Sequence, residues 1–251
     1  MSGHSKWAQI KRQKGVVDAR RGRLFTKLSR EIAVAARQGG GNPEANLRLR
    51  LAMQKARDNN MPIENIERAI KRGTGGIEGA ILEEVVYEGY GPKGVAILLE
   101  VMTDNRNRAV AEVRNVFTRS GGSLGEAGCV SWLFSTKGVI TIDTNRVDAE
   151  EIALYVIDAG AKDVNMVGNC LEVHTVPEDL ERMRKALEEK SLPIISSELS
   201  MVPKSVVELD EEAALQTLKL MDRLEELDEV QRLFINADFP DEALEKYRSQ
   251  G

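Results

Sequence analysis

The residues of this sequence best placed to do chemistry are lysines and arginines near the N-terminus, and that chemistry is the neutralisation of a polyanion. The first 37 residues carry ten Lys and Arg side chains against two acidic ones, Asp18 and Glu31. A protein that concentrates positive charge at one end commonly reserves that end for a polyanion, here nucleic acid. The candidate contacts are Lys6, Lys11, Arg12, Lys14, Arg20, Arg21, Arg23, Lys27 and Arg30.

An aromatic side chain, Trp7, lies among these cations and is also a candidate contact. Aromatic rings beside cations stack on bases in single-stranded nucleic acid. The same residue would serve equally well as an apolar anchor for the basic segment. The simpler alternative for the whole segment is a solvated, charged tail.

The charge separates along the chain. Residues 1–76 hold 17 Lys and Arg against 6 Asp and Glu, whereas residues 77–251 hold 18 against 34. The net charges are therefore +11 and −16, and the −5 of the whole chain is their sum. We expect a dipolar molecule whose acidic body is repelled by a polyanion and so orients the basic end toward it.

A second candidate contact is the polar run from Thr103 to Arg108. Asn105 is placed to cap a helix, which leaves Arg106 and Arg108 pointing to water. Because a helix N-terminus beside two arginines favours anions, these arginines are alternatively phosphate or RNA contacts. Spacing alone leaves both interpretations open, with capping the simpler one.

Enzymatic chemistry is not indicated. The two histidines, His4 and His174, have no metal-ligand spacing, and Cys129 and Cys170 have no nucleophile signature. The segment Gly89–Gly94 fits G-x-G-x-x-G, but a strand follows it where a dinucleotide site needs a helix. We expect no catalytic residues, no metal and no cofactor.

The same features bear on location. Two cysteines in 251 residues do not make a disulfide framework, which favours a reducing compartment. No apolar run is long enough for a membrane span, and no apolar core follows the N-terminal charges as in a signal peptide. We expect a cytoplasmic protein.

The basic part should form an arm and three short helices. Glycines punctuate residues 1–22, which we expect to be an extended arm. Apolar residues recur with helical period from Arg23 to Gly39, and Asn42 with Pro43 has the form of a cap and first residue of a second helix. A third helix should follow Pro62 and end at Gly73.

The remainder should be two mixed α/β units. The pattern from 138 to 202 predicts the order βαββαβ of a ferredoxin-like unit. Flanking strands, including one over Val130–Phe134 and one over Val230–Ile235, should form a second sheet that this unit interrupts. The expected fold class is α+β, with boundaries at residues 1–76, at 77–136 joined with 204–251, and at 137–203.

Two long stretches resemble the YebC family. They read GHSKWAQIKRQKGVVDARRGRLFTKLSREI (Gly3 to Ile32) and YEGYGPKGVAILLEVMTDNRNRAVAEVRNVFTRSGGSLGEAGCVSWLF (Tyr87 to Phe134). The layout matches over essentially the whole chain. Ala109 and Cys129 depart from the family pattern, where Thr and Ser are expected, but neither change alters charge.

The resemblance implies a three-domain α+β protein with an N-terminal helical bundle and no enzymatic activity. It implies first a cytoplasmic DNA-binding transcriptional regulator. Related proteins, including mitochondrial ones, are translation activators, so the alternative is a ribosome-associated factor that binds ribosomal RNA. An interaction scaffold with no nucleic-acid role is the third hypothesis, and it predicts no salt-dependent affinity for nucleic acid.

Overall fold

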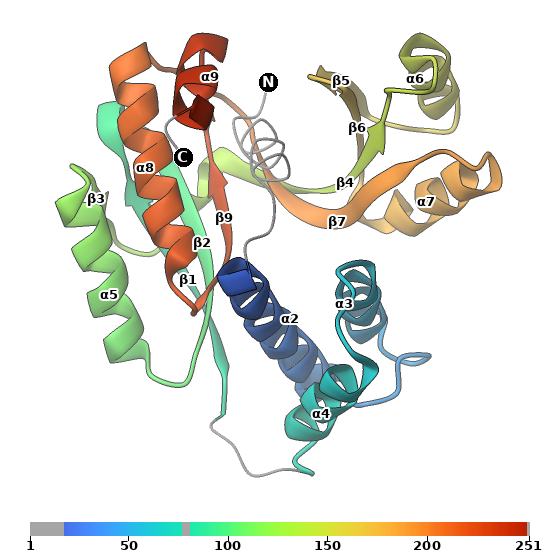
Figure 1. The fold of residues 1–251 in the computed structure, drawn as a ribbon, viewed down its shortest axis with the longest axis horizontal. Helices are drawn as coiled ribbons and strands as arrows, with labels where there is room; N and C mark the ends of the chain where they lie inside the picture. The colour runs from blue at the N-terminus through green and yellow to red at the C-terminus, as the bar shows by residue number, and fades with distance from the viewer. Residues whose placement is uncertain (1–17, 77–80, 250–251) are drawn as a thin grey trace.

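The computed structural model describes residues 18–76 and 81–249, with side chains from Arg21 onward in the first of these ranges. Figure 1 shows three units: a bundle of helices, a sheet with helices on one side, and a smaller α/β unit. This arrangement confirms the α+β fold class expected from the sequence.

The N-terminal unit packs three helices around a small apolar core. Leu28, Ile32, Leu49 and Ile66 are fully buried at its centre, as the helical period of apolar residues requires. The helices are α2 (Asp18–Gly39), α3 (Leu47–Asp58) and α4 (Ile63–Gly73).

Two of the predicted boundaries in this unit are wrong. Helix α2 begins at Asp18 and runs through Gly22, so residues 18–22 are not part of an extended arm. A single glycine costs a helix only about 1 kcal/mol, which tertiary packing of the rest of the helix overcomes. The predicted arm before Asp18 lies outside the described residues.

The second helix begins at Leu47, four residues after the predicted start at Pro43, because Asn46 is the real cap. Its side-chain oxygen accepts a hydrogen bond from the Leu49 amide at 3.0 Å. Its side-chain nitrogen donates to the carbonyl of Ala35 at 2.8 Å, and the residue is buried. Asn42 instead makes a local turn with Glu44.

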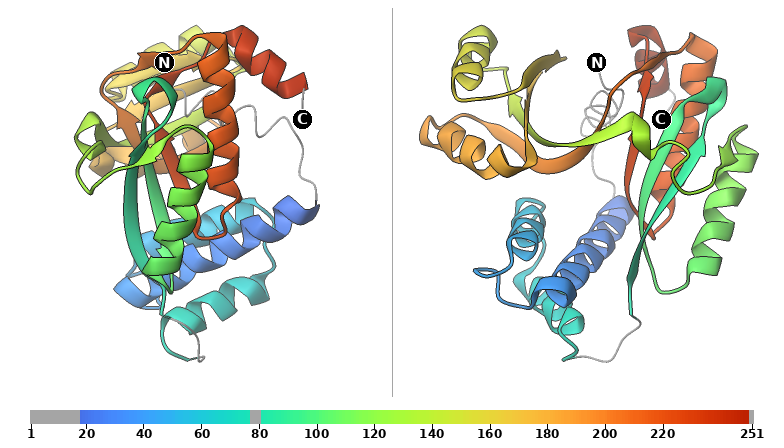
Figure 2. Two further views of the ribbon diagram at one scale, coloured as in Figure 1. Left: turned by 90° about the vertical axis from the view of Figure 1, so that its left-hand side faces the viewer. Right: turned by 180° about the vertical axis from the view of Figure 1, so that it is seen from behind.

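The second unit is a four-stranded sheet in the order β3-β1-β2-β9. Helices α5, α8 and α9 bury one of its faces, as both views of Figure 2 show. The elements are β1 (Glu83–Tyr90), β2 (Ala96–Thr103), α5 (Arg106–Arg119), β3 (Ser123–Leu124), α8 (Glu211–Glu226), β9 (Val230–Ile235) and α9 (Asp241–Ser249), with a parallel pair formed by β8 (Val207–Glu208) and β10 (Ala237–Asp238).

The third unit lies between β3 and β9 in the chain, so it interrupts the first sheet. Its strands pair in the order β5-β6-β4-β7, and two helices cover one face, which is the ferredoxin-like plan. The elements are β4 (Phe134–Asp143), α6 (Ala149–Asp158), β5 (Asp163–Val167), β6 (Cys170–Thr175), α7 (Leu180–Glu189) and β7 (Ile194–Pro203), with a short 3-10 turn at Pro177–Asp179.

The strand predicted over Val130–Phe134 is wrong. The residues Ser131–Leu133 form a single 3-10 turn, and β4 begins only at Phe134. The cause lies 42 and 43 residues away, because the carboxylate of Glu88 accepts the backbone N–H groups of Val130 and Ser131. Those amides therefore cannot take part in a strand ladder.

Candidate nucleic-acid interface

Half of the predicted contacts lie at or beyond the start of the described structure. Trp7 and the four lysines and arginines from Lys6 to Lys14 (Lys6, Lys11, Arg12 and Lys14) lie outside the described residues. Arg20 is placed by its backbone alone, in the first turn of α2. These six residues remain predictions.

Three of the predicted contacts come together on one face of α2, against the protein's own body. Lys27 donates to the carbonyl oxygen of Glu225 at 2.7 Å, and Arg30 donates to the carbonyl oxygen of Asp228. Arg23 lies 4.0 Å from the carboxylate of Glu226. Figure 1 shows α2 starting beside the turn that joins α8 to β9.

Helix geometry explains this contact. Arg23, Lys27 and Arg30 are spaced i, i+4 and i+7, which puts them on one side of a helix. The last turn of an α-helix presents carbonyl groups that lie outside the helix's own hydrogen-bond ladder, together with the negative end of the helix dipole, and both attract cations. These three side chains therefore dock the bundle onto the body, and a polyanion that used them would have to compete with that contact.

Arg21 has a different environment, one turn from the docking contact. It is exposed, and its guanidinium lies over the ring of Phe25 at 5.5 Å from the ring centre. A stacked guanidinium keeps its N–H groups at the ring's edge available to an anion. Of the four predicted contacts on α2 with described side chains, Arg21 is the best placed to meet phosphate.

The two arginines of α5 lie away from this face and are paired with carboxylates. Arg106 contacts Glu83 at 2.5 Å, and Arg108 contacts both Asp104, at 2.6 Å, and Glu229. The hydrogen bond to Glu229 and then that to Asp104 raise the pKa of Arg108. Asn105 caps α5 by accepting the Arg108 amide at 3.1 Å, as predicted. Both arginines therefore have structural partners in the carboxylates around them.

Sequence reasoning singled out the N-terminal segment and passed over a second group of cations on the bundle. Within residues 18–76 and 81–249, no carboxylate lies within ion-pair distance of the exposed group Arg57, Arg68, Lys71 and Arg72. Three of them have the i, i+3, i+4 spacing of one helix face at the end of α4. These four residues are among the 17 Lys and Arg counted in residues 1–76, so the charge count included them without singling them out.

A separate set of charged side chains joins the three units. These side chains pair with one another. Lys55 of α3 lies 3.8 Å from Glu31 of α2 and 3.5 Å from Glu198 of β7. Burial lowers the pKa of Lys55, but Glu198 and Glu31 outweigh it, so the pKa is raised. Arg232 of β9 contacts Glu100 at 2.6 Å and donates to a carbonyl of β7 at 2.6 Å.

A further ion pair ties the bundle to the sheet. Arg48 of α3 contacts Glu84 of β1, and Gln38 of α2 donates to the same carboxylate at 2.8 Å. The hydrogen bond from Arg48 holds the pKa of Glu84 below its usual value. The bundle therefore meets the sheet on the face opposite α5 and α8.

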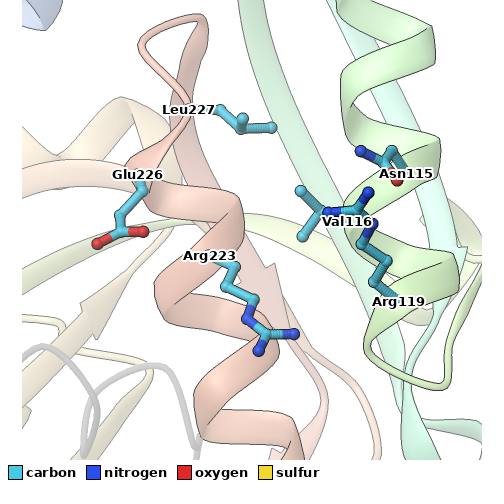
Figure 3. A pocket seen from close by; sticks show the side chains of 6 residues that line it. All are labelled: Asn115, Val116, Arg119, Arg223, Glu226 and Leu227. Carbon is cyan, nitrogen blue, oxygen red and sulfur yellow. The ribbon is translucent and has the colours of Figure 1, made fainter.

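An open groove of about 630 Å³ lies between α5 and α8. Figure 3 shows Arg119 and Arg223 reaching into it from the two helices, with Val116 and Leu227 as its apolar lining. The described residues contain no group of three His, Cys, Asp or Glu side chains that could hold a metal ion. None of the helices described is long and apolar enough to cross a membrane.

Comparisons with known proteins match almost the whole chain. A family model described as the TACO1/YebC protein N-terminal domain matches residues 5–76, and one described as the TACO1/YebC second and third domain matches residues 82–237. A protein of Dehalococcoides mccartyi named probable transcriptional regulatory protein is 58% identical over 250 residues, 100% of both chains. One of the same name from Dictyoglomus thermophilum is 52% identical over 246 residues, 98% of this chain and 99% of the relative.

A solved structure agrees with these matches. The crystal structure of a conserved hypothetical protein from Aquifex aeolicus superposes with a TM-score of 0.83 at 50% sequence identity, covering 90% of this chain and 93% of that one. The family models together span most of the sequence, and the relatives are matched over nearly their full length. The chain belongs to the TACO1/YebC family.

Proposed function

We propose that this protein is a non-enzymatic regulator of gene expression that binds nucleic acid through its basic N-terminal unit. The observation that carries the proposal is the charge division: 17 Lys and Arg against 6 Asp and Glu in residues 1–76, in a chain of net charge −5. Within that stretch, residues 18–76 contain one folded unit, the α2–α4 bundle. Neutralising phosphates releases counterions, which makes such a surface bind strongly at low salt.

Transcriptional regulation in the cytoplasm through DNA is the first candidate. It is supported by the relatives at 58% and 52% identity, which are named probable transcriptional regulatory proteins. In this role, Arg21 and the four cations at the ends of α3 and α4 contact the phosphate backbone. Such contacts fix position on the duplex and carry no sequence information themselves.

Binding of ribosomal RNA in translation is the second candidate. It is favoured by the docking of Arg23, Lys27 and Arg30 against the turn after α8. A helix that reads a DNA groove presents its side chains to base edges, whereas this face of α2 is turned to protein. Backbone contact without sequence reading suits a structured RNA as well as it suits DNA.

Crosslinking in living cells, followed by sequencing of the bound DNA and RNA, separates the candidates. Recurrent duplex sites near promoters would support transcriptional regulation. Crosslinks mainly to ribosomal RNA, without recurrent duplex sites, would instead support a role in translation. If neither nucleic acid is enriched over an unrelated acidic protein, the chain is an interaction scaffold and the proposal fails.

A further inference from the structure

Two exposed aromatic side chains share one backbone acceptor at the edge of the first sheet. The indole Nε1 of Trp132 donates to the carbonyl oxygen of Cys129 at 3.0 Å, and the hydroxyl of Tyr90 donates to the same oxygen at 2.9 Å. Trp132 is 65% exposed and Tyr90 is 36% exposed. The polar atom of each ring is thus satisfied within the protein, and the ring faces are left to the solvent.

The backbone of the loop that carries Trp132 is hydrogen-bonded to a buried carboxylate. Glu88 is 6% exposed, and its carboxylate accepts the amides of Gly128 at 2.8 Å and of Val130 and Ser131 at 2.7 Å each. Burial of Glu88 raises its pKa, but these three donors outweigh burial and hold the pKa below its usual value. The aromatic pair is therefore preorganised, which lowers the entropy cost of binding a ligand.

The surroundings of the rings favour a nucleic-acid base over an apolar protein surface. Lys204 is exposed and donates to the backbone carbonyl oxygen of Trp132 at 2.8 Å, which puts a cation at the backbone of this residue, while the carboxylate of Glu88 accepts backbone amides of the loop. The residues on either side of Trp132 are half-buried. Single-strand binding sites combine projecting rings with nearby cations, whereas protein hot spots lie within a packed apolar patch.

The pair also lies on the same side of the sheet as the basic bundle. Alternation along β1 puts Glu84, Glu88 and Tyr90 on one face, and Glu84 is the residue that Arg48 of the bundle contacts. About six residues of strand separate the two points, a distance of about 20 Å. The rings therefore lie on the face of the sheet that the bundle contacts.

We propose that Trp132 and Tyr90 form a stacking platform for the unpaired bases of a single-stranded nucleic acid whose backbone the N-terminal unit holds. The inference rests on the proposed function and narrows its ligand to strands with free bases. Because the bases of a duplex are already paired and stacked, double-stranded regions would bind only through their phosphates.

The two tryptophans of the chain allow a direct test. Trp7→Phe leaves Trp132 as the single tryptophan, so its fluorescence reports on the platform alone. Short single-stranded RNA and DNA of one sequence should both quench this emission, because a stacked base quenches an indole. An abasic strand of equal length, a duplex and heparin should bind, by fluorescence anisotropy or competition, without quenching it.

Affinity gives the second readout. Trp132→Ala should weaken single-strand binding about tenfold, the order of one base stacked on one ring. The slope of log K against log salt should stay unchanged, because stacking releases no counterions. Trp132→Phe, which keeps a ring, should recover part of the affinity, and Leu154→Ala, which removes an equally exposed apolar side chain on α6, should change nothing.

Failure of the stacking platform and failure of the proposed function give different results. If single strands bind Trp7→Phe but leave the emission of Trp132 unchanged, and Trp132→Ala binds as wild type, the platform is refuted and the proposed function stands. That result would point to Trp132 as a contact for a protein. If no nucleic acid binds the wild-type chain at low salt, both proposals fall.

Discussion

Glu88 illustrates how single buried charges fix the functional surface of this protein. Its carboxylate accepts three backbone amides from the loop that ends in Ser131–Leu133, and they replace the water it loses on burial. Hydrogen bonds to an ionised group are about twice as strong as neutral ones. One side chain of β1 thus converts an apolar run into an ordered turn.

Replacing Glu88 by Gln should lower the free energy of unfolding by about 1–3 kcal/mol at neutral pH, because charge-assisted hydrogen bonds become neutral ones. The folded pKa of Glu88 lies below that of an unfolded glutamate, near 4.3. Its contribution is therefore complete above that pH and is lost as the pH falls through the folded pKa. Urea unfolding from pH 7 to pH 3 should show the two proteins converging below about pH 4. A gap that stays constant down to pH 3 would contradict this role of the Glu88 carboxylate.

The two arginines of α5 make a second comparison at this scale. Arg108→Ala should lower the unfolding temperature, since it leaves the buried carboxylate of Glu229 with the Thr103 hydroxyl as its described partner. Arg106→Ala, whose pair with Glu83 is exposed, should stay within about 0.5 kcal/mol. Thermal unfolding of both variants provides the measurement. Equal stability of the two, with a matching loss of nucleic-acid affinity, would instead make Arg108 a binding residue.

At the scale of elements, the contact between α2 and the end of α8 decides how the basic unit is presented. It joins side chains to carbonyl groups 198 positions away in the sequence. Each contact is a charge-assisted hydrogen bond or a long ion pair, and the apolar core of the bundle is separate from that of the body. The docking is therefore polar and sensitive to salt.

Replacing Lys27 and Arg30 together by Met keeps their apolar stems and removes the hydrogen bonds to the last turn of α8 and to the turn after it. Opening of the contact should become easier, and amide hydrogen exchange in α2 should quicken by up to about tenfold, the effect of about 1–1.5 kcal/mol. Arg68→Met, on the exposed side of α4, is the matched control and should leave exchange in α2 as it is. Unchanged exchange in the double variant would mean that the contact does not hold the bundle.

Elements with strong local signals could be predicted from the sequence, and those set by distant contacts could not. The cap at Asn105 and the strand Val230–Ile235 were correct because capping and an enrichment in β-branched and aromatic residues act locally. The second helix was placed too early because the cap at Asn46 is fixed by a carbonyl of α2. The 3-10 turn containing Trp132 depends on Glu88, so no local pattern indicated that this ring is exposed and fixed.

The same division applies to the candidate interface. The charge count identified the basic unit correctly as the place where cations gather. It did not separate the cations that dock α2 from those left to solvent, because that distinction depends on residues 225–228. The structure alone shows that Arg21, already a candidate, is exposed, and it adds the exposed group Arg57, Arg68, Lys71 and Arg72.

At the scale of the whole molecule, the protein is a dipole made of a folded basic unit and an acidic body. A polyanion attracts residues 1–76 and repels the remaining residues, which carry 34 Asp and Glu against 18 Lys and Arg. The field of the body therefore orients the approach of the basic unit and limits nonspecific contact elsewhere. The central claim is that this basic unit neutralises the phosphates of the bound nucleic acid.

The most direct test measures how the affinity of the full chain for nucleic acid depends on salt. Wild type is compared with a variant in which Lys11, Arg12, Arg20 and Arg21 are changed to Gln, and with a control in which four exposed cations of the body are changed to Gln: Arg146, Lys162, Lys185 and Lys219. Both variants lose the same charge, so only position differs.

We expect a flatter slope of log K against log salt for the N-terminal variant, by about 0.7 to 0.9 for each phosphate that is no longer neutralised, and an unchanged slope for the control. Weaker binding of the control with an unchanged slope for the N-terminal variant would contradict the central claim, because the interface would then lie on the acidic body.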